Sequence, residues 1–86
     1  MNRVPIQLPE LGTAGEPVRV CCWLVEAGED VEVGDRLVEV LIHGITFDVA
    51  SPASGTIVRI EKSLNAAVGA GDVLGWIIPR GEEPCE

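Results

Sequence analysis

The chain has 86 residues, with 14 acidic against 6 basic side chains and a formal net charge of −8 at neutral pH. Its length gives one small domain with a modest core, and its acidity argues against nucleic acids and anionic membranes as partners, because both are negatively charged. We expect neither a secretory signal nor a membrane span, since the first residues lack an apolar segment and no apolar run approaches ~18 residues.

In chain order, short runs rich in β-branched and aromatic residues alternate with glycine, proline and other turn residues. No amphipathic helix of useful length occurs. The sequence therefore predicts an all-β fold, a sandwich or flattened barrel, in residues 1–80, followed by an acidic disordered tail at 81–86. The expected strands are residues 4–8, 18–25, 38–42, 45–49, 56–61 and 73–78, with a short strand or bridge inside 27–35.

Residues 38–49 are typical of a β-hairpin closed by a two-residue turn at His43 and Gly44. A type I′ turn needs positive φ at both central residues, which glycine adopts without penalty and histidine tolerates better than most residues. With this turn, the apolar residues of both strands lie on one face of the ribbon. The expected cross-strand pairs are Val38 with Val49, Val40 with Phe47, and Ile42 with Ile45.

The sequence contains an internal repeat with an offset of 37 residues, which places Gly34-Asp35 on Gly71-Asp72. Two similar halves of this size predict a quasi-twofold arrangement in which each half completes the sheet of the other, because neither half can bury a core alone. One turn is altered in the second half, where Asn65-Ala66 stands in place of Gly28-Glu29.

Four glycines at the ends of the expected strands are predicted to adopt positive φ in turns, and the two tryptophans are predicted to lie in the core. Cys21 and Cys22 are adjacent in a strand-like run, so one is expected in the core and the other nearer solvent. The glycines are Gly28, Gly34, Gly55 and Gly71, and the tryptophans are Trp23 and Trp76.

The order of the turn motifs resembles the lipoyl domain of the acyltransferase components of 2-oxo acid dehydrogenase complexes, within the wider biotinyl/lipoyl carrier family. The resemblance covers roughly residues 4–78. It implies a flattened barrel of two four-stranded antiparallel sheets, with both termini at one end and a hairpin that displays a lipoate-bearing lysine at the other. The motifs are LPELG at 8–12, WLV at 23–25, AGEDV at 27–31, VGDxLVEV at 33–40 and VASPASGxI at 49–57.

The hairpin departs from the family pattern at the residue that carries the cofactor. Where the family has approximately Glu-Thr-Asp-Lys-Ala, this chain has Leu41-Ile42-His43-Gly44-Ile45, so Gly44 stands at the position of the acceptor lysine. Biotin carriers place their lysine at the same tip between methionines, and the only methionine here is Met1. We therefore expect neither lipoate nor biotin as a cofactor. Lys62, the only lysine, is expected to be a solvated surface residue.

No other motif in the sequence supports catalysis or metal binding, and we expect no catalytic residue and no metal site. His43 lacks an obvious orienting group or convergent ligands, which favours a turn residue over a general base or a metal ligand. Glu39 and Asp48 should face each other on the solvent side of the hairpin as a charged edge rather than a catalytic dyad. Three cysteines without a disulfide framework indicate a reducing compartment, for which we expect the cytoplasm.

The hairpin is also the best candidate for contact with a partner. Leu41 should lie on the outward face, and with Ile42 and Ile45 it could form an apolar patch rimmed by Glu39 and Asp48. A single exposed leucine needs no such explanation, so both interpretations stay open. By resemblance, lipoyl-recognising enzymes contact the hairpin, here 39–48, and the loop 12–17.

The sequence thus predicts a non-catalytic interaction module, linked by resemblance to 2-oxo acid dehydrogenase or lipoylation systems. Its negative charge favours contact with basic protein surfaces, unless the charge only keeps the domain soluble. One alternative is a genuine acyl or carboxyl carrier that acts through Lys62 or alongside a paralogue that has the lysine. Another is a structural spacer in a larger carrier or adaptor protein, although the short acidic tail without an Ala/Pro-rich linker favours a stand-alone chain.

Overall fold

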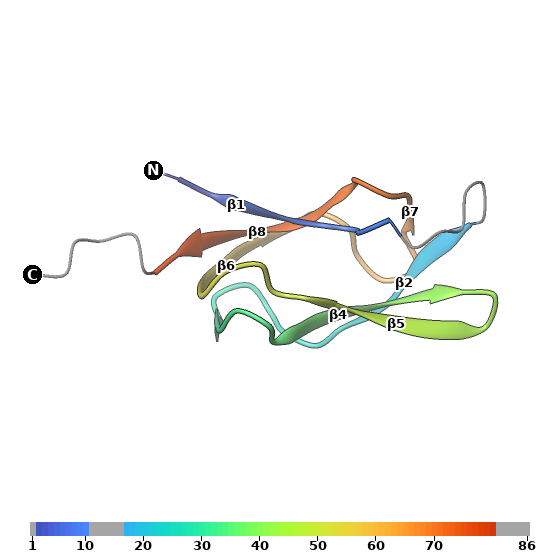
Figure 1. The fold of residues 1–86 in the computed structure, drawn as a ribbon, viewed down its shortest axis with the longest axis horizontal. Coiled ribbons are helices and arrows are strands. Elements are labelled where there is room, and N and C mark those ends of the chain that lie inside the picture. Colours follow the sequence, from blue (N-terminus) through green and yellow to red (C-terminus); the bar gives the residue numbers. More distant parts are fainter. Residues whose placement is uncertain (1, 11–16, 81–86) are drawn as a thin grey trace, which may run out of the picture.

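The computed structural model describes residues 2–10 and 17–80, and these residues form eight strands (Figure 1). They make two four-stranded antiparallel sheets, with the orders β1-β8-β6-β3 and β5-β4-β2-β7. The expected all-β fold with two such sheets is confirmed. The strands are β1 (Val4–Gln7), β2 (Val18–Trp23), β3 (Asp30–Val31), β4 (Arg36–Ile42), β5 (Ile45–Ala50), β6 (Gly55–Ile60), β7 (Ala67–Val68) and β8 (Val73–Pro79).

Some expectations fall wholly or largely outside the described residues. The tail at 81–86 lies outside them, as does most of the loop 12–17. Among the described residues, no helix is long and apolar enough to cross a membrane. The start of β1 and the end of β8 both lie at one end of the sandwich, and the β4–β5 turn lies at the opposite end (Figure 1).

The two halves of the internal repeat exchange strands, as the offset predicts. β3 belongs to the first half but pairs with β6, and β7 belongs to the second half but pairs with β2. The turn contacts repeat as well: the Gly28 N–H donates to the Ile57 carbonyl at 2.7 Å, and the Asn65 N–H donates to the Val20 carbonyl at 2.9 Å. Each half therefore completes the sheet of the other.

The altered turn of the second half keeps the shape of the first. Asn65 has φ 68°, while Gly28, the residue it replaces in the repeat, has φ 100°. Asparagine enters the left-handed region at low cost because its short side chain bonds locally. The replacement therefore changes the residue and preserves the turn.

Both sheets carry a bulge at the same position of the repeat, between Val20 and Cys22 in β2 and between Ile57 and Arg59 in β6. The extra residue shifts the alternation of side chains, so that Val20 and Trp23 both reach the core. The expectation of one buried and one exposed cysteine was wrong, because the bulge leaves both Cys21 and Cys22 half-buried.

The core lies between the sheets and draws on both halves. Trp23 packs against it as expected, with its indole N–H donating to the Lys62 carbonyl at 2.7 Å. Trp76 was wrongly placed in the core: it pairs with Arg59 on the outer face and donates to the Glu61 carboxylate at 3.0 Å. The buried residues are Ile6, Leu8, Val18, Val20, Val31, Leu37, Val38, Val40, Ile42, Val49, Ile57, Val68, Leu74 and Ile77.

Gly55 allows two strands to pack closely, whereas the other three glycines singled out in the sequence adopt positive φ in turns. Gly28, Gly34 and Gly71 have φ values of 100°, 93° and 88°, as predicted. Gly55 does not have positive φ, so that expectation was wrong. Its backbone packs so closely on β8 that a Cβ atom there would overlap the carbonyl oxygen of Ile78.

Candidate functional site

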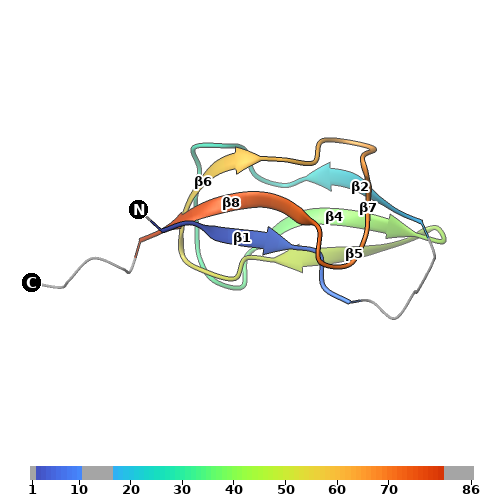
Figure 2. The same cartoon turned by 90° about the horizontal axis from the view of Figure 1, so that it is seen from above.

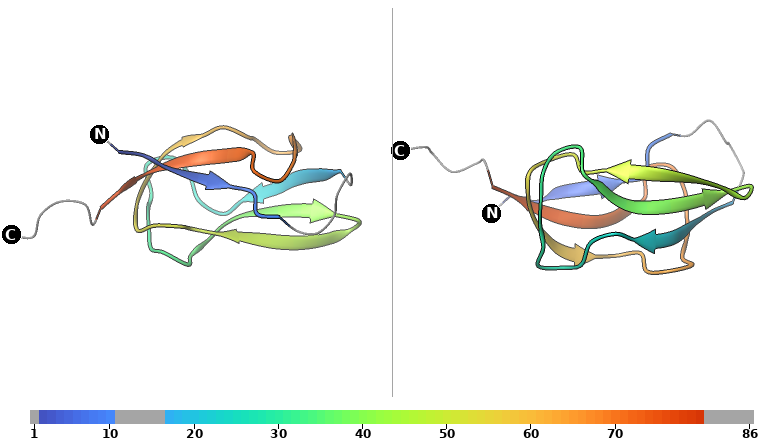
Figure 3. Two further views of the ribbon diagram at one scale, coloured as in Figure 1. Left: turned by 45° about the horizontal axis from the view of Figure 1, so that its top comes forward. Right: turned by 90° about the horizontal axis from the view of Figure 1, so that it is seen from below.

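The β4–β5 hairpin has the register and the turn that the sequence predicts. Ile42 pairs with Ile45, and the alternation continues through Val40 with Phe47 to Val38 with Val49. His43 has φ 54° and Gly44 has φ 75°, as a type I′ turn requires. The turn projects beyond the rest of the sandwich, where both views of Figure 3 place it at the far end of the molecule.

The two strands of the hairpin differ in burial, although their apolar side chains share one face. Val40 and Ile42 of β4 are buried, whereas Ile45 and Phe47 of β5 are 58% and 40% exposed. β5 is an edge strand of its sheet, so within the part of the chain that the structure describes its side chains near the tip lack strand neighbours on one side. Ile42 therefore cannot belong to an exposed patch, and that part of the expectation was wrong.

Exposed apolar side chains nevertheless surround the hairpin near its tip. Leu41 is 36% exposed and lies opposite Thr46, as its alternation predicts. Ile45 and Phe47 lie on the other face of the ribbon, so the exposed residues cover both faces. We call Leu41, Ile45 and Phe47 the apolar tip. Phe47 was not predicted to be exposed from the sequence, and the feature that accounts for its exposure is the position of β5 at the edge of the sheet.

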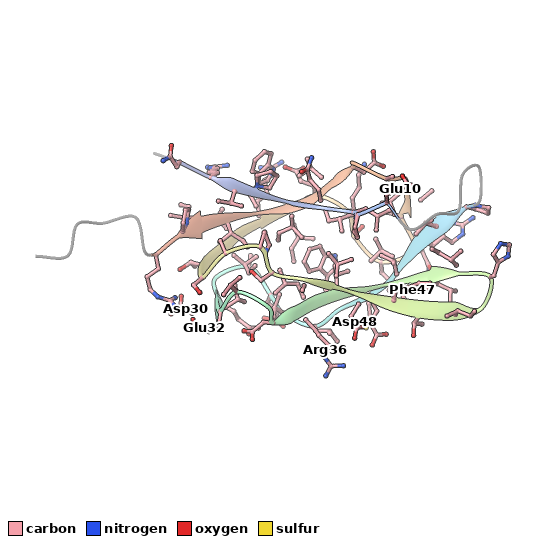
Figure 4. The ribbon with its side chains drawn as sticks, in the orientation of Figure 1. Glu10, Asp30, Glu32, Arg36, Phe47 and Asp48 are labelled. Carbon is pink, nitrogen blue, oxygen red and sulfur yellow. The ribbon has the colours of Figure 1, made fainter. Side chains whose placement is uncertain are left out.

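The two acids of the hairpin face each other on its outer side, as predicted, and each also contacts a third residue. Glu39 pairs with Asp48 across the strands. Arg36 Nη1 lies 3.3 Å from Asp48 Oδ2, and the two side chains project from the lower sheet in Figure 4. Cys22 Sγ lies 3.8 Å from Glu39 Oε1. The expected charged edge is therefore a small network rather than an isolated pair.

Partial burial, followed by the negative charge of Glu39, raises the pKa of the Cys22 thiol. The raised pKa means that the folded state favours the protonated thiol of Cys22. The contribution of this group to the free energy of unfolding is therefore present at neutral pH and is lost as the pH rises through the raised pKa. We therefore expect the thiol to stay protonated and to alkylate slowly near neutral pH.

Replacing Glu39 by glutamine is expected to lower the pKa of Cys22 toward its ordinary value and to speed its alkylation at least about twofold at pH 8. Intact-mass kinetics with iodoacetamide measure the rate, in a Cys21→Ser, Cys85→Ser background that leaves one thiol. Asp48→Asn should have a smaller effect, because Asp48 contributes least to the shift. An equal effect of both changes would contradict the assigned cause.

The remaining titratable candidates do not gather into a reactive site. His43 is exposed at the turn. Within residues 2–10 and 17–80, no three His, Cys, Asp or Glu side chains converge to hold a metal ion. Lys62 follows β6, is half-buried, and donates its backbone N–H to the Leu74 carbonyl at 3.2 Å.

A shallow groove of about 590 Å³ lies between the edge strands of the two sheets. β1 and β5 run along the same side of the sandwich, as Figure 2 shows from above. The groove is lined from β1 and the segment after it, from the end of β5, and from the turn before β8. Its lining includes Pro5, Leu8, Pro9, Glu10, Ala50 and Pro52.

Comparison with known proteins gives a consistent picture. The model of a family described as biotin-requiring enzyme (Biotin_lipoyl) matches residues 4–77. The dihydrolipoyllysine-residue succinyltransferase component of the Rickettsia conorii 2-oxoglutarate dehydrogenase complex is 32% identical over 75 residues, which are 87% of this chain and 19% of that protein. The acetyltransferase component of the Azotobacter vinelandii pyruvate dehydrogenase complex is 35% identical over 69 residues, which are 80% of this chain and 11% of that protein.

A solved structure supports the fold. The lipoyl domain of the 2-oxoglutarate dehydrogenase complex from Azotobacter vinelandii superposes with a TM-score of 0.72 at 24% identity, covering 91% of this chain and 99% of that domain. The chain thus spans a fifth or less of the curated relatives named above but nearly all of the isolated lipoyl domain.

Proposed function

Since this chain belongs to the Biotin_lipoyl family, whose model matches residues 4–77, we propose that it is a lipoyl-domain-like module that binds a protein partner and carries no acyl or carboxyl group itself. The observation that carries this proposal is the hairpin tip, where Gly44 occupies the second position of the turn. By the family resemblance, this is the position of the lysine that holds lipoate or biotin. An amide link to either group needs an amine, and glycine has none.

The geometry of the turn supports the loss of the carrier role. His43 and Gly44 both have positive φ, a conformation that glycine favours and that costs a lysine roughly 1 kcal/mol. The repeat partner of Gly44 is Gly81, which also lacks an amine and lies outside the described residues. Lys62 is half-buried after β6, far in sequence from this turn. By sequence, neither Gly44 nor its repeat partner therefore offers an amine.

The apolar tip supports a binding role. Leu41, Ile45 and Phe47 place exposed apolar surface on the element that the family uses for presentation, and such surface favours protein contact. Because the relatives are named as components of 2-oxo acid dehydrogenase complexes, we propose a partner from such a complex or from a lipoylation system. The free thiols Cys21 and Cys22 suit a reducing compartment, and the cytoplasm remains our proposal.

Intact mass after co-expression with lipoate and biotin ligases tests the proposal. The wild-type chain is expected to stay unmodified, whereas Gly44→Lys is expected to gain one lipoyl or biotinyl group, because a Cβ at Gly44 meets no atom of the described residues within 4 Å and the positive φ costs a lysine only about 1 kcal/mol. Gly44→Arg is the matched control, since it adds a long cation without an acylable amine.

Two outcomes would contradict the proposal. Modification of the wild-type chain that disappears in Lys62→Arg would make Lys62 an acceptor and the protein a carrier. An unmodified Gly44→Lys variant with a native fold would show that the tip is not the acceptor-equivalent position.

A further inference from the structure

Among residues 2–10 and 17–80, the two sheets leave four edge strands, and β5 is the one whose backbone is best suited to pairing with another chain. β3 and β7 have only two residues each. β1 has four residues, contains Pro5, and is interrupted by an irregularity between Ile6 and Gln7. β5 has six residues and contains neither proline nor lysine, the residues that commonly protect an edge.

The register of the hairpin identifies which backbone groups of β5 point outward. In a two-residue hairpin the pair that flanks the turn is hydrogen-bonded, and this pair is Ile42 with Ile45. Ile45 and Phe47 therefore direct their N–H and C=O groups toward β4. Thr46 and Asp48 direct theirs away from the sheet, where an added strand would pair with them.

The surface beside this edge suits an extended segment. Ile45 and Phe47 present exposed apolar side chains on the inner face, next to the outward-pointing backbone. At the other end of β5, Ala50 and Pro52 line the groove between β1 and β5. An added strand would cover the side chains near the tip and run beside β5 toward this groove.

The charges favour a basic occupant. Glu10 is the only charged residue that lines the groove among the described residues, and Asp48, whose carboxylate also contacts Arg36, lies on the edge strand itself (Figure 4). The whole chain carries a formal charge of −8, so a second copy would bring a like charge to the same edge, whereas a basic segment would be attracted to it.

We propose that β5 accepts an extended basic segment of a partner protein as a fifth strand of the sheet β5-β4-β2-β7. Apolar side chains at alternate positions of the segment would cover Ile45 and Phe47, and lysine or arginine between them would lie on the side of Asp48. This inference rests on the proposed function, because it names the chemistry of the partner that the module binds.

A seven-residue peptide of alternating valine and lysine, acetylated and amidated at its ends, serves as the probe. Amide exchange measured by NMR should slow about tenfold or more at Thr46 and Asp48 with saturating peptide. The amides of Ile45 and Phe47, already bonded to β4, should change much less. A peptide of alternating valine and glutamate should bind at least about tenfold more weakly, because it meets like charge.

Two further comparisons separate strand pairing from other contact. Thr46→Pro removes an outward N–H while keeping the bonds to β4, and it should weaken peptide binding at least about tenfold relative to Thr46→Val, which keeps the N–H. N-methylation of the peptide amides that face β5 should abolish binding, whereas methylation of the alternate amides, which face away, should not. This comparison needs no variant of the protein.

Equal binding to both Thr46 variants and to both methylated peptides would overturn the proposal, as would unchanged exchange at Thr46 and Asp48. Dimerisation through β5 in sedimentation experiments would assign the edge to a second copy instead. If the wild-type chain stays unmodified by the ligases while the peptide fails to bind, only this inference fails. If the wild-type chain is lipoylated while the peptide still binds, the non-carrier function fails and the edge site stands.

Discussion

Gly55→Ala is expected to destabilise the domain by about 3 kcal/mol or more, because overpacking against rigid backbone cannot be relieved by a rotamer change. The added Cβ would overlap the carbonyl oxygen of Ile78 and lie 2.8 Å from Pro79 Cα, which are main-chain atoms of β8. β6 pairs with β8 along its length, so moving either strand disturbs the sheet. Urea unfolding followed by tryptophan fluorescence measures the loss.

Gly69→Ala is the matched control for this substitution. A Cβ at Gly69 meets no atom within 4 Å, and Gly69 does not have positive φ. Alanine there is expected to change the free energy of unfolding by less than about 0.5 kcal/mol or to stabilise slightly, since it reduces the freedom of the unfolded chain. Equal destabilisation by the two substitutions would show that the close approach of β6 to β8 is not the cause.

Leu37→Ala and Leu74→Ala are each expected to cost about 2 to 5 kcal/mol, through lost burial and the cavity that remains. Both leucines are fully buried, and they occupy equivalent positions of the internal repeat, one in β4 and one in β8. The two losses should therefore be similar. Either is a large fraction of the ~5 to 15 kcal/mol that stabilises a typical domain. Thermal and urea unfolding measure both.

Leu64→Ala provides the comparison, because Leu64 is 63% exposed. Its truncation is expected to change stability by no more than about 0.5 kcal/mol. A loss below about 1 kcal/mol for Leu37→Ala would contradict a core shared by the two halves. A large loss for only one of the two buried leucines would contradict their structural equivalence.

Features that depend on local pattern were predictable from the sequence. The alternation of apolar residues and the chemistry of the turn determine the pairing of Val40 with Phe47 and the positive φ at His43 and Gly44. The repeat predicted the exchange of short strands, even though Ala67–Val68 is too short to recognise as β7 by itself. The resemblance added the assembly into two four-stranded sheets.

Features that depend on the neighbours of a strand were not predictable from its own residues. The close approach of Gly55 to β8 is a tertiary contact, and turn chemistry alone suggested positive φ instead. The bulge in β2 changed which of its side chains face inward and left both cysteines half-buried, and Trp76 lies on the outer face of β8, opposite Arg59. Exposure of Phe47 follows from the position of β5 at a sheet edge, which alternation cannot reveal.

The exchange of β3 and β7 between the halves also constrains how the chain folds during synthesis. The sheet around β2 stays incomplete until Ala67–Val68 has been made, and the pairing of Val4 with Ile77 joins nearly the first described residue to nearly the last. Such non-local pairing makes folding slow relative to helical domains of this size. The domain therefore folds as one unit after most of it has left the ribosome. A chain break between the repeats would give two fragments that are folded only while they remain associated.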